Sequence, residues 1–247
     1  MIYVIGDSHS LLFTLQNDVK STPLDFGICT AMNPHPDFTV YHIGPATAYN
    51  INKEQSSNLS FEKIQFLLKN GYFPDGASVM ISLGEIDMRA HVYKHVDGSP
   101  GSLRRTIDAV LHNYFLLVDR LRECGLSIIC YGPPASMPEG RRSNPEHPTC
   151  GTEKARNSAT EMFTQGLKEH AAERRIPMFS LFPYMINDDR TTRSEMMIDG
   201  CHVSPRLRRL AFKLLKKELD AAGRYNLTSG RVQDEITLKT RLAPASA

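Results

Sequence analysis

The sequence lacks any long hydrophobic run, because none of its apolar stretches approaches the roughly 20 residues that cross a bilayer as a helix. It therefore gives no support for a membrane-spanning protein. An excess of one charge is also missing, since 29 Lys and Arg residues face 27 Asp and Glu residues and the formal net charge is +2. A net charge this close to zero does not indicate the basic surface that nucleic-acid binding requires. We expect neither a membrane nor a nucleic acid as partner.

Cysteines are few, and they lack the spacing of a metal or redox motif. The five residues are odd in number, scattered, and form no Cys-x-x-Cys pair. Structural disulfides and a zinc knuckle are therefore not expected, and free thiols suit a reducing compartment. The first apolar stretch begins at Ile2, which leaves no room for a secretory signal before it. We expect the protein to remain in the cytoplasm.

Two further absences narrow the function. No Gly-rich stretch ends in Gly-Lys-Ser or Gly-Lys-Thr, so a nucleotide-phosphate loop is excluded. No internal repeat is found, and 247 residues suffice for one sizeable core. We expect a single domain over residues 1–222, followed at 223–247 by a weakly periodic extension or edge element.

Short apolar runs alternate with segments of helical periodicity. After the run at the amino terminus, others lie at 25–30, 38–44, 77–84, 126–132 and 176–182. Strands that alternate with helices predict a parallel sheet covered on both faces, a three-layer α/β/α fold of flavodoxin-like type. The clearest helix follows Ser102, and the last begins at Ser204-Pro205, a cap followed by the proline that suits a first helical turn. The last helix is predicted to turn a basic face to solvent: Arg206, Arg208, Arg209, Lys213, Lys216 and Lys217.

Ser8 stands where the first strand ends, in the stretch "GDSHS". Open α/β sheets place their ligand crevices at the carboxyl ends of strands, so Ser8 is a candidate nucleophile. A cap is the alternative, because either Asp7 or Ser8 could accept a free backbone N–H of the following helix. His9 is interpreted as a residue at the start of that helix rather than as a second base.

A second candidate group lies far from Ser8, in "MIDGCHVSP" before the last helix. Asp199 precedes His202 by three residues, and one tight turn can bring the carboxylate against one imidazole nitrogen. The other nitrogen could then face a hydroxyl group. The same spacing also arises in ordinary turns and caps.

Four stretches together resemble the SGNH (GDSL-type) hydrolase superfamily, over roughly residues 1 to 220: "GDSHS", "HIGPATAYN", "SLGEID" and "DGCHVSP". The resemblance implies that Ser8 is the nucleophile and that Asp199 and His202 complete a catalytic triad. It also implies that the backbone N–H groups of Ser8 and Gly44 belong to an oxyanion hole.

One position departs from the family pattern, and the sequence resembles a divergent branch. The family's Gly-x-Asn-Asp reads Gly84-Glu85-Ile86-Asp87, so Ile86 occupies the position of the asparagine that normally donates to the oxyanion. Loss of one such donor costs on the order of a hundred- to a thousandfold in rate. Another residue could replace it, the activity could be slow or tuned to a different reaction, or the protein could bind a ligand without turnover. The candidate replacements are Asn50, Arg89 and His91.

Polar residues gather directly after the run 77–84, and we expect them to line the crevice: Glu85, Asp87, Arg89 and His91. With His95 they mix carboxylate and imidazole groups, but the spacing matches no helical metal motif. We therefore expect no metal site and no cofactor. The predicted function is a serine-dependent hydrolase or acyltransferase that acts on an oxygen ester, such as an acylated glycan or a small metabolite.

Overall fold

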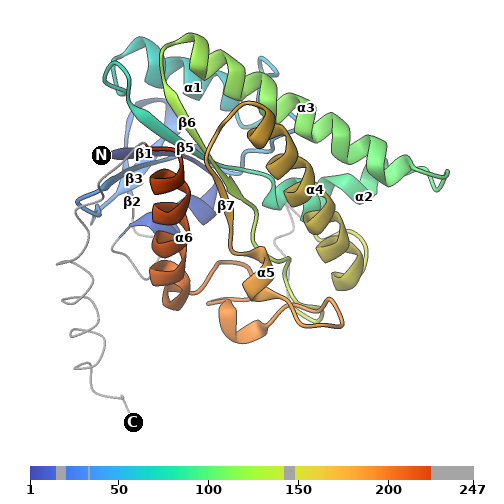
Figure 1. Ribbon diagram of the computed structural model, residues 1–247. Helices are drawn as coiled ribbons and strands as arrows, with labels where there is room; N and C mark the ends of the chain where they lie inside the picture. Colours follow the sequence, from blue (N-terminus) through green and yellow to red (C-terminus); the bar gives the residue numbers. More distant parts are fainter. Residues whose placement is uncertain (15–20, 33, 142–147, 224–247) are drawn as a thin grey trace.

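A computed structural model describes residues 1–14, 21–32, 34–141 and 148–223 (Figure 1). The predicted extension at 223–247 lies outside the described residues apart from Gly223. Seven strands form one sheet in the order β2-β3-β4-β1-β5-β6-β7. The strands are β1 (Ile2–Gly6), β2 (Ser21–Pro23), β3 (Cys29–Ala31), β4 (Phe38–His42), β5 (Ser78–Ser82), β6 (Ser127–Gly132) and β7 (Met178–Ser180).

The parallel part of the sheet has the strand order of flavodoxin. β1 pairs in parallel with β4 on one side and β5 on the other, and β6 and β7 continue the sheet in parallel. The order β4-β1-β5-β6-β7 corresponds to 2-1-3-4-5, which places the reversal of strand order at β1. The predicted flavodoxin-like α/β/α fold is confirmed.

The other edge of the sheet differs from the prediction, since β2 and β3 are antiparallel to their neighbours. The predicted strand at 25–30 begins only at Cys29, because Asp25–Gly27 form a 3₁₀ turn. Phe26 and Gly27 there have φ of 64° and 67°, a left-handed conformation that reverses the chain into a hairpin. The β2 sequence, Ser-Thr-Pro, has no apolar run that could have predicted it.

Helices cover both faces of the sheet (Figure 1). One core lies under α1 (Ser60–Lys69), α3 (Ser102–Glu123) and α4 (Glu153–Glu173), and the other lies under the 3₁₀ helix Ser8–Phe13 and α6 (Arg208–Ala221). The short helices are α2 (Val92–His95) and α5 (Phe182–Met185). Strand residues alternate between the cores, so that Val79 and Ile81 face the first while Met80 faces the second. In the described part of the chain no helix is long and apolar enough to cross a bilayer.

The helices that the sequence predicted most clearly are α3 and α6. The expected stripe of α3 is buried from Ile107 to Leu121. Ser204 caps a first turn of 3₁₀ type, Pro205–Leu207, which continues into α6. The basic face of α6 requires one correction: Arg208 is only 6% exposed, and its Nε donates to the Leu12 carbonyl at 2.9 Å. Arg208 thus bonds to the short helix Ser8–Phe13 and does not face solvent.

Replacing Arg208 tests this contact. Arg208→Met leaves the buried Leu12 carbonyl without its guanidinium donor, which costs about 1 to 3 kcal/mol. We expect that loss in the free energy of unfolding measured with urea. Arg209→Met, at the exposed neighbouring position, is the matched control and should change it by less than about 0.5 kcal/mol. Equal effects of the two substitutions would show that the contact contributes nothing.

Candidate active site

Three strand ends meet at one edge of the sheet. Gly6, the last residue of β1, is in register with His42 of β4 and with Ser82 of β5. A side chain at Gly6 does not fit, because a Cβ there would lie 2.2 Å from the Ser82 carbonyl oxygen. Ser8, Gly44 and Gly84 each follow their strand end by two residues. The structure thus gathers these predicted site residues at neighbouring strand ends.

Asp7, rather than Ser8, caps the short helix behind β1. The Asp7 Oδ1 accepts a hydrogen bond from the His9 N–H at 2.9 Å, and the helix Ser8–Phe13 is of 3₁₀ type. Burial raises the pKa of Asp7 to about 6, against the lowering effect of the nearby His9. The Ser8 hydroxyl is thereby left for another partner, and its Oγ lies 2.7 Å from the His202 Nε2.

His202 is held in a tight loop between the bridged residues Met197 and Val203. The Asp199 Oδ1 accepts the backbone N–H groups of Cys201 and His202 at 2.9 and 2.8 Å. Its Oδ2 lies 2.7 Å from the His202 Nδ1. Partial burial opposes ionisation of Asp199, but the hydrogen bonds from His202 and Cys201 outweigh it and lower the pKa to about 2. The carboxylate is therefore fixed in its charged form against the ring.

Ser8, His202 and Asp199 thus form one chain of hydrogen bonds. With the Nδ1 proton held by Asp199, the Nε2 of a neutral ring can accept a proton from the Ser8 hydroxyl. Such an arrangement can generate a nucleophilic oxygen at Ser8.

The loop after β4 is held by residues that no motif indicated. The Ile43 carbonyl accepts hydrogen bonds from the Lys63 Nζ and the Asn58 Nδ2, both at 3.0 Å. Burial lowers the pKa of Lys63. Gly44 follows with φ of 84°, and a Cβ there would lie 2.6 Å from the Asn58 Oδ1. Lys63 is a residue of α1, and the sequence gives no sign that this lysine is buried.

The stretch after β5 is buried rather than exposed in a crevice. Arg89 Nε donates to Glu85 Oε1 at 2.7 Å, and both side chains are nearly inaccessible to solvent. Burial would raise the pKa of Glu85, but the charge of Arg89 and the contact with His9 lower it to about 2. Gly84 has φ of 111° and packs on Phe163 of α4. Ile86, at the position of the family's asparagine, is buried as well.

Asp87 fastens two loops together. It is fully buried, and its two carboxylate oxygens accept the N–H groups of Ala48 and Tyr49 at 2.7 and 3.0 Å. Burial raises its pKa to about 7, although both hydrogen bonds act in the opposite direction. Asp87 therefore holds the loop that follows Gly44 against the end of β5. It does not line the crevice as predicted.

The candidate donors Asn50 and His91 are both half-buried. Asn50 lies in the loop after Gly44, where its N–H donates to Thr47 Oγ1 at 3.3 Å. His91 ends the helical turn Asp87–His91. Their roles remain predictions.

Two neighbours of the site, the buried His9 and the half-buried Cys201, were not predicted as part of it. The His9 ring lies 5.4 Å from the His202 ring between centroids, and its Nε2 lies 3.5 Å from Glu85 Oε2. Burial opposes protonation of His9, but contacts with Cys201 and Glu85 and the charge of Asp7 raise its pKa well above the usual value. A single residue beside the nucleophile and a single cysteine carry no spacing signal that could have revealed this cluster.

Solved structures show the same fold. A protein assigned as an acylhydrolase from Bacteroides fragilis superposes with a TM-score of 0.50 at 15% identity, covering 88% of this chain and 87% of that one. A GDSL-like lipase from Bacteroides thetaiotaomicron gives 0.50 at 13% identity, covering 90% and 88%. The chain has the SGNH hydrolase fold. No protein-family model and no curated protein sequence matches it.

Removing the Asp87 carboxylate should disrupt this SGNH framework. Asp87→Ala leaves the buried Ala48 N–H and the part-buried Tyr49 N–H without their acceptor, which we expect to lower the free energy of unfolding by about 2 to 5 kcal/mol. Asp75→Ala, at an exposed position ahead of β5, is the control and should have almost no effect. Urea unfolding of the two variants checks this, and similar midpoints would refute the role of Asp87.

Proposed function

We propose that this protein is a serine-dependent hydrolase or acyltransferase of the SGNH type that acts on an oxygen ester. The observation that supports it most strongly is the hydrogen-bonded chain from Ser8 through His202 to Asp199, with 2.7 Å on each side of the ring. The position of Ser8 at the reversal of strand order also supports it, because ligands of such sheets bind there.

The reaction begins when His202 Nε2 takes the Ser8 proton and the Ser8 Oγ attacks the acyl carbon. Asp199 stabilises the imidazolium that forms. The tetrahedral intermediate then expels the alcohol oxygen, which receives the proton from His202, and the acyl group remains on Ser8. Water or a sugar hydroxyl then gives up a proton to His202 and attacks the acyl-serine. The acyl–Oγ bond breaks, Ser8 takes the proton back from His202, and the free acid or the new ester leaves. These steps require no cofactor.

The oxyanion that forms in this reaction needs donors, and the loop after β4 supplies one. Gly44 N–H has no acceptor among the described residues. It belongs to the same peptide group as the Ile43 carbonyl, on which the buried Lys63 ammonium lies. A cation on the carbonyl draws electrons from the peptide and makes its N–H a stronger donor. Lys63 is in this proposal a positioning residue that acts through Gly44.

Ile86 favours a second candidate function. Its apolar side chain stands where the family has an amide donor, so one stabilising interaction of the transition state is missing unless Asn50, Arg89 or His91 replaces it. A module that binds an ester without turnover would need no such donor. For the enzyme, we propose an acylated glycan or a small acylated metabolite as substrate.

A fluorophosphonate probe separates the two candidates. It reacts with a serine whose proton is taken by a neighbouring base, so we expect an adduct at Ser8 of the intact protein. His202→Ala should abolish the adduct, and Asp199→Asn should weaken it by disturbing the tautomer. The measurement is mass spectrometry of the digested protein after long incubation, because a missing donor slows the reaction. Absence of a Ser8 adduct, while a known serine esterase in the same buffer is fully labelled, would favour the binding module.

Replacing Lys63 tests its role in the reaction. Lys63→Met should lower kcat for an activated acyl ester by on the order of tenfold or more and leave KM nearly unchanged, because the oxyanion develops only in the transition state. Lys69→Met, at the exposed end of the same helix, is the control and should match the parent protein. A rise in KM at constant kcat would instead place Lys63 in substrate binding.

A further inference from the structure

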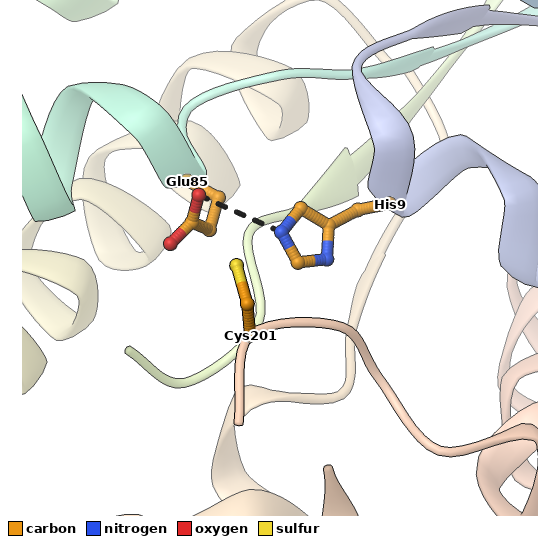
Figure 2. Close-up of side chains that lie close together, drawn as sticks. All are labelled: His9, Glu85 and Cys201. Carbon is orange, nitrogen blue, oxygen red and sulfur yellow. Dashed lines mark ion pairs between the residues drawn. The ribbon is translucent and has the colours of Figure 1, made fainter. Parts of the chain in front are cut away.

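Three potential metal ligands converge beside the proposed triad. An imidazole nitrogen of His9, a carboxylate oxygen of Glu85 and the Cys201 sulfur all lie within 4.8 Å of one another. Figure 2 shows the three side chains pointing toward a common centre from three separate segments. His9 follows the nucleophile, Glu85 follows β5, and Cys201 lies in the loop between Asp199 and His202. His9 and Glu85 are buried, and Cys201 is half-buried.

Among the residues that the structure describes, one carboxylate oxygen of this cluster has no hydrogen-bond partner. The Glu85 carboxylate is 4% exposed, and its Oε1 accepts from Arg89 at 2.7 Å. Its Oε2 points toward His9 Nε2 at 3.5 Å and has no hydrogen-bond partner in the described part of the chain. A buried carboxylate oxygen without a hydrogen bond destabilises the fold, because its lost hydration is not replaced. A cation bound between the three ligands would offset this cost.

We propose that His9, Glu85 and Cys201 form a binding site for a divalent metal ion of the zinc class. Imidazole, carboxylate and thiolate are all ligands that Zn²⁺ takes. The mixed nitrogen and sulfur set disfavours Mg²⁺ and Ca²⁺, which prefer oxygen ligands. Arg89 then fixes the orientation of the ligating carboxylate from outside, as partners of metal ligands commonly do. This proposal does not depend on the catalytic role of Ser8.

The charges around the cluster accommodate such an ion. Zn²⁺ together with the Glu85 carboxylate and a Cys201 thiolate has no net charge, and Arg89 is compensated by Asp7, whose charge acts on both Arg89 and His9. Without the metal, a proton on His9 takes the place of the cation beside Glu85. Metal and proton therefore compete for His9, and binding of the metal releases the proton from its ring.

A metal at this place would fasten the histidine loop to the sheet. The ligands come from positions 9, 85 and 201, so the ion closes long segments of chain. Cys201 directly precedes His202, and its attachment would restrict the loop that carries Asp199 and His202. The expected consequence is a protein that is stabilised by metal.

Cobalt and zinc provide the direct test on the reduced, metal-free full chain. Co²⁺ bound by a thiolate shows a sulfur-to-metal charge-transfer band, so titration should give such a band with one equivalent bound. Zn²⁺ should displace Co²⁺ and, at about 100 times its Kd, raise Tm by about 5 to 10 °C.

Matched cysteine variants decide whether the proposed site is responsible. Cys201→Ser should abolish the band and weaken binding by about 100-fold or more, since even outer partners of metal ligands contribute 10- to 100-fold. Cys124→Ser, at an exposed position, and Ser8→Ala should both bind as the parent protein does. The proposal is overturned if no band forms, if Cys201→Ser retains it, or if Cys124→Ser loses it.

Discussion

One imidazole ring, hydrogen-bonded at both nitrogens, joins the residues of the proposed active site. His202 lies 2.7 Å from Ser8 on one side and 2.7 Å from Asp199 on the other, joining positions 194 residues apart in the chain. Asp199 forms its own bonds within the same tight loop, and Asp7 takes over the capping that Ser8 could have performed. Because Asp7 caps the short helix, the Ser8 hydroxyl is left to the ring.

The parallel sheet is what makes this arrangement possible. Gly6, His42 and Ser82 are in register, so the segments that follow the three strands leave the sheet side by side. Polar residues then fix these segments: Lys63 and Asn58 hold the peptide before Gly44, and Asp87 holds the loop behind it. Each of these contacts joins two segments that are distant in the sequence. Lys63 and Asp87 are buried, so they support the loops instead of facing solvent.

The apolar runs predicted the parallel core, and local spacing predicted that Asp199 can pair with His202. That Ser8 joins them in a triad was implied by the resemblance to the SGNH superfamily. It did not reveal the antiparallel hairpin of β2 and β3, whose strands are three residues each. Nor did it reveal the burial of Arg208, because a cation in a basic helical pattern is ordinarily solvated. Lys63, His9 and Cys201 were missed for a similar reason: their roles depend on contacts between distant segments.

Capture of the acyl group is the most direct test of whether His202 activates Ser8. When the protein is mixed with an activated ester such as p-nitrophenyl acetate, we expect a burst of one equivalent of p-nitrophenol. The quenched protein should carry an acetyl group on Ser8. The burst should be absent in Ser8→Ala. An acetyl group on Cys201 beside the ring, or no burst at all with folded protein, would contradict the claim that His202 activates Ser8.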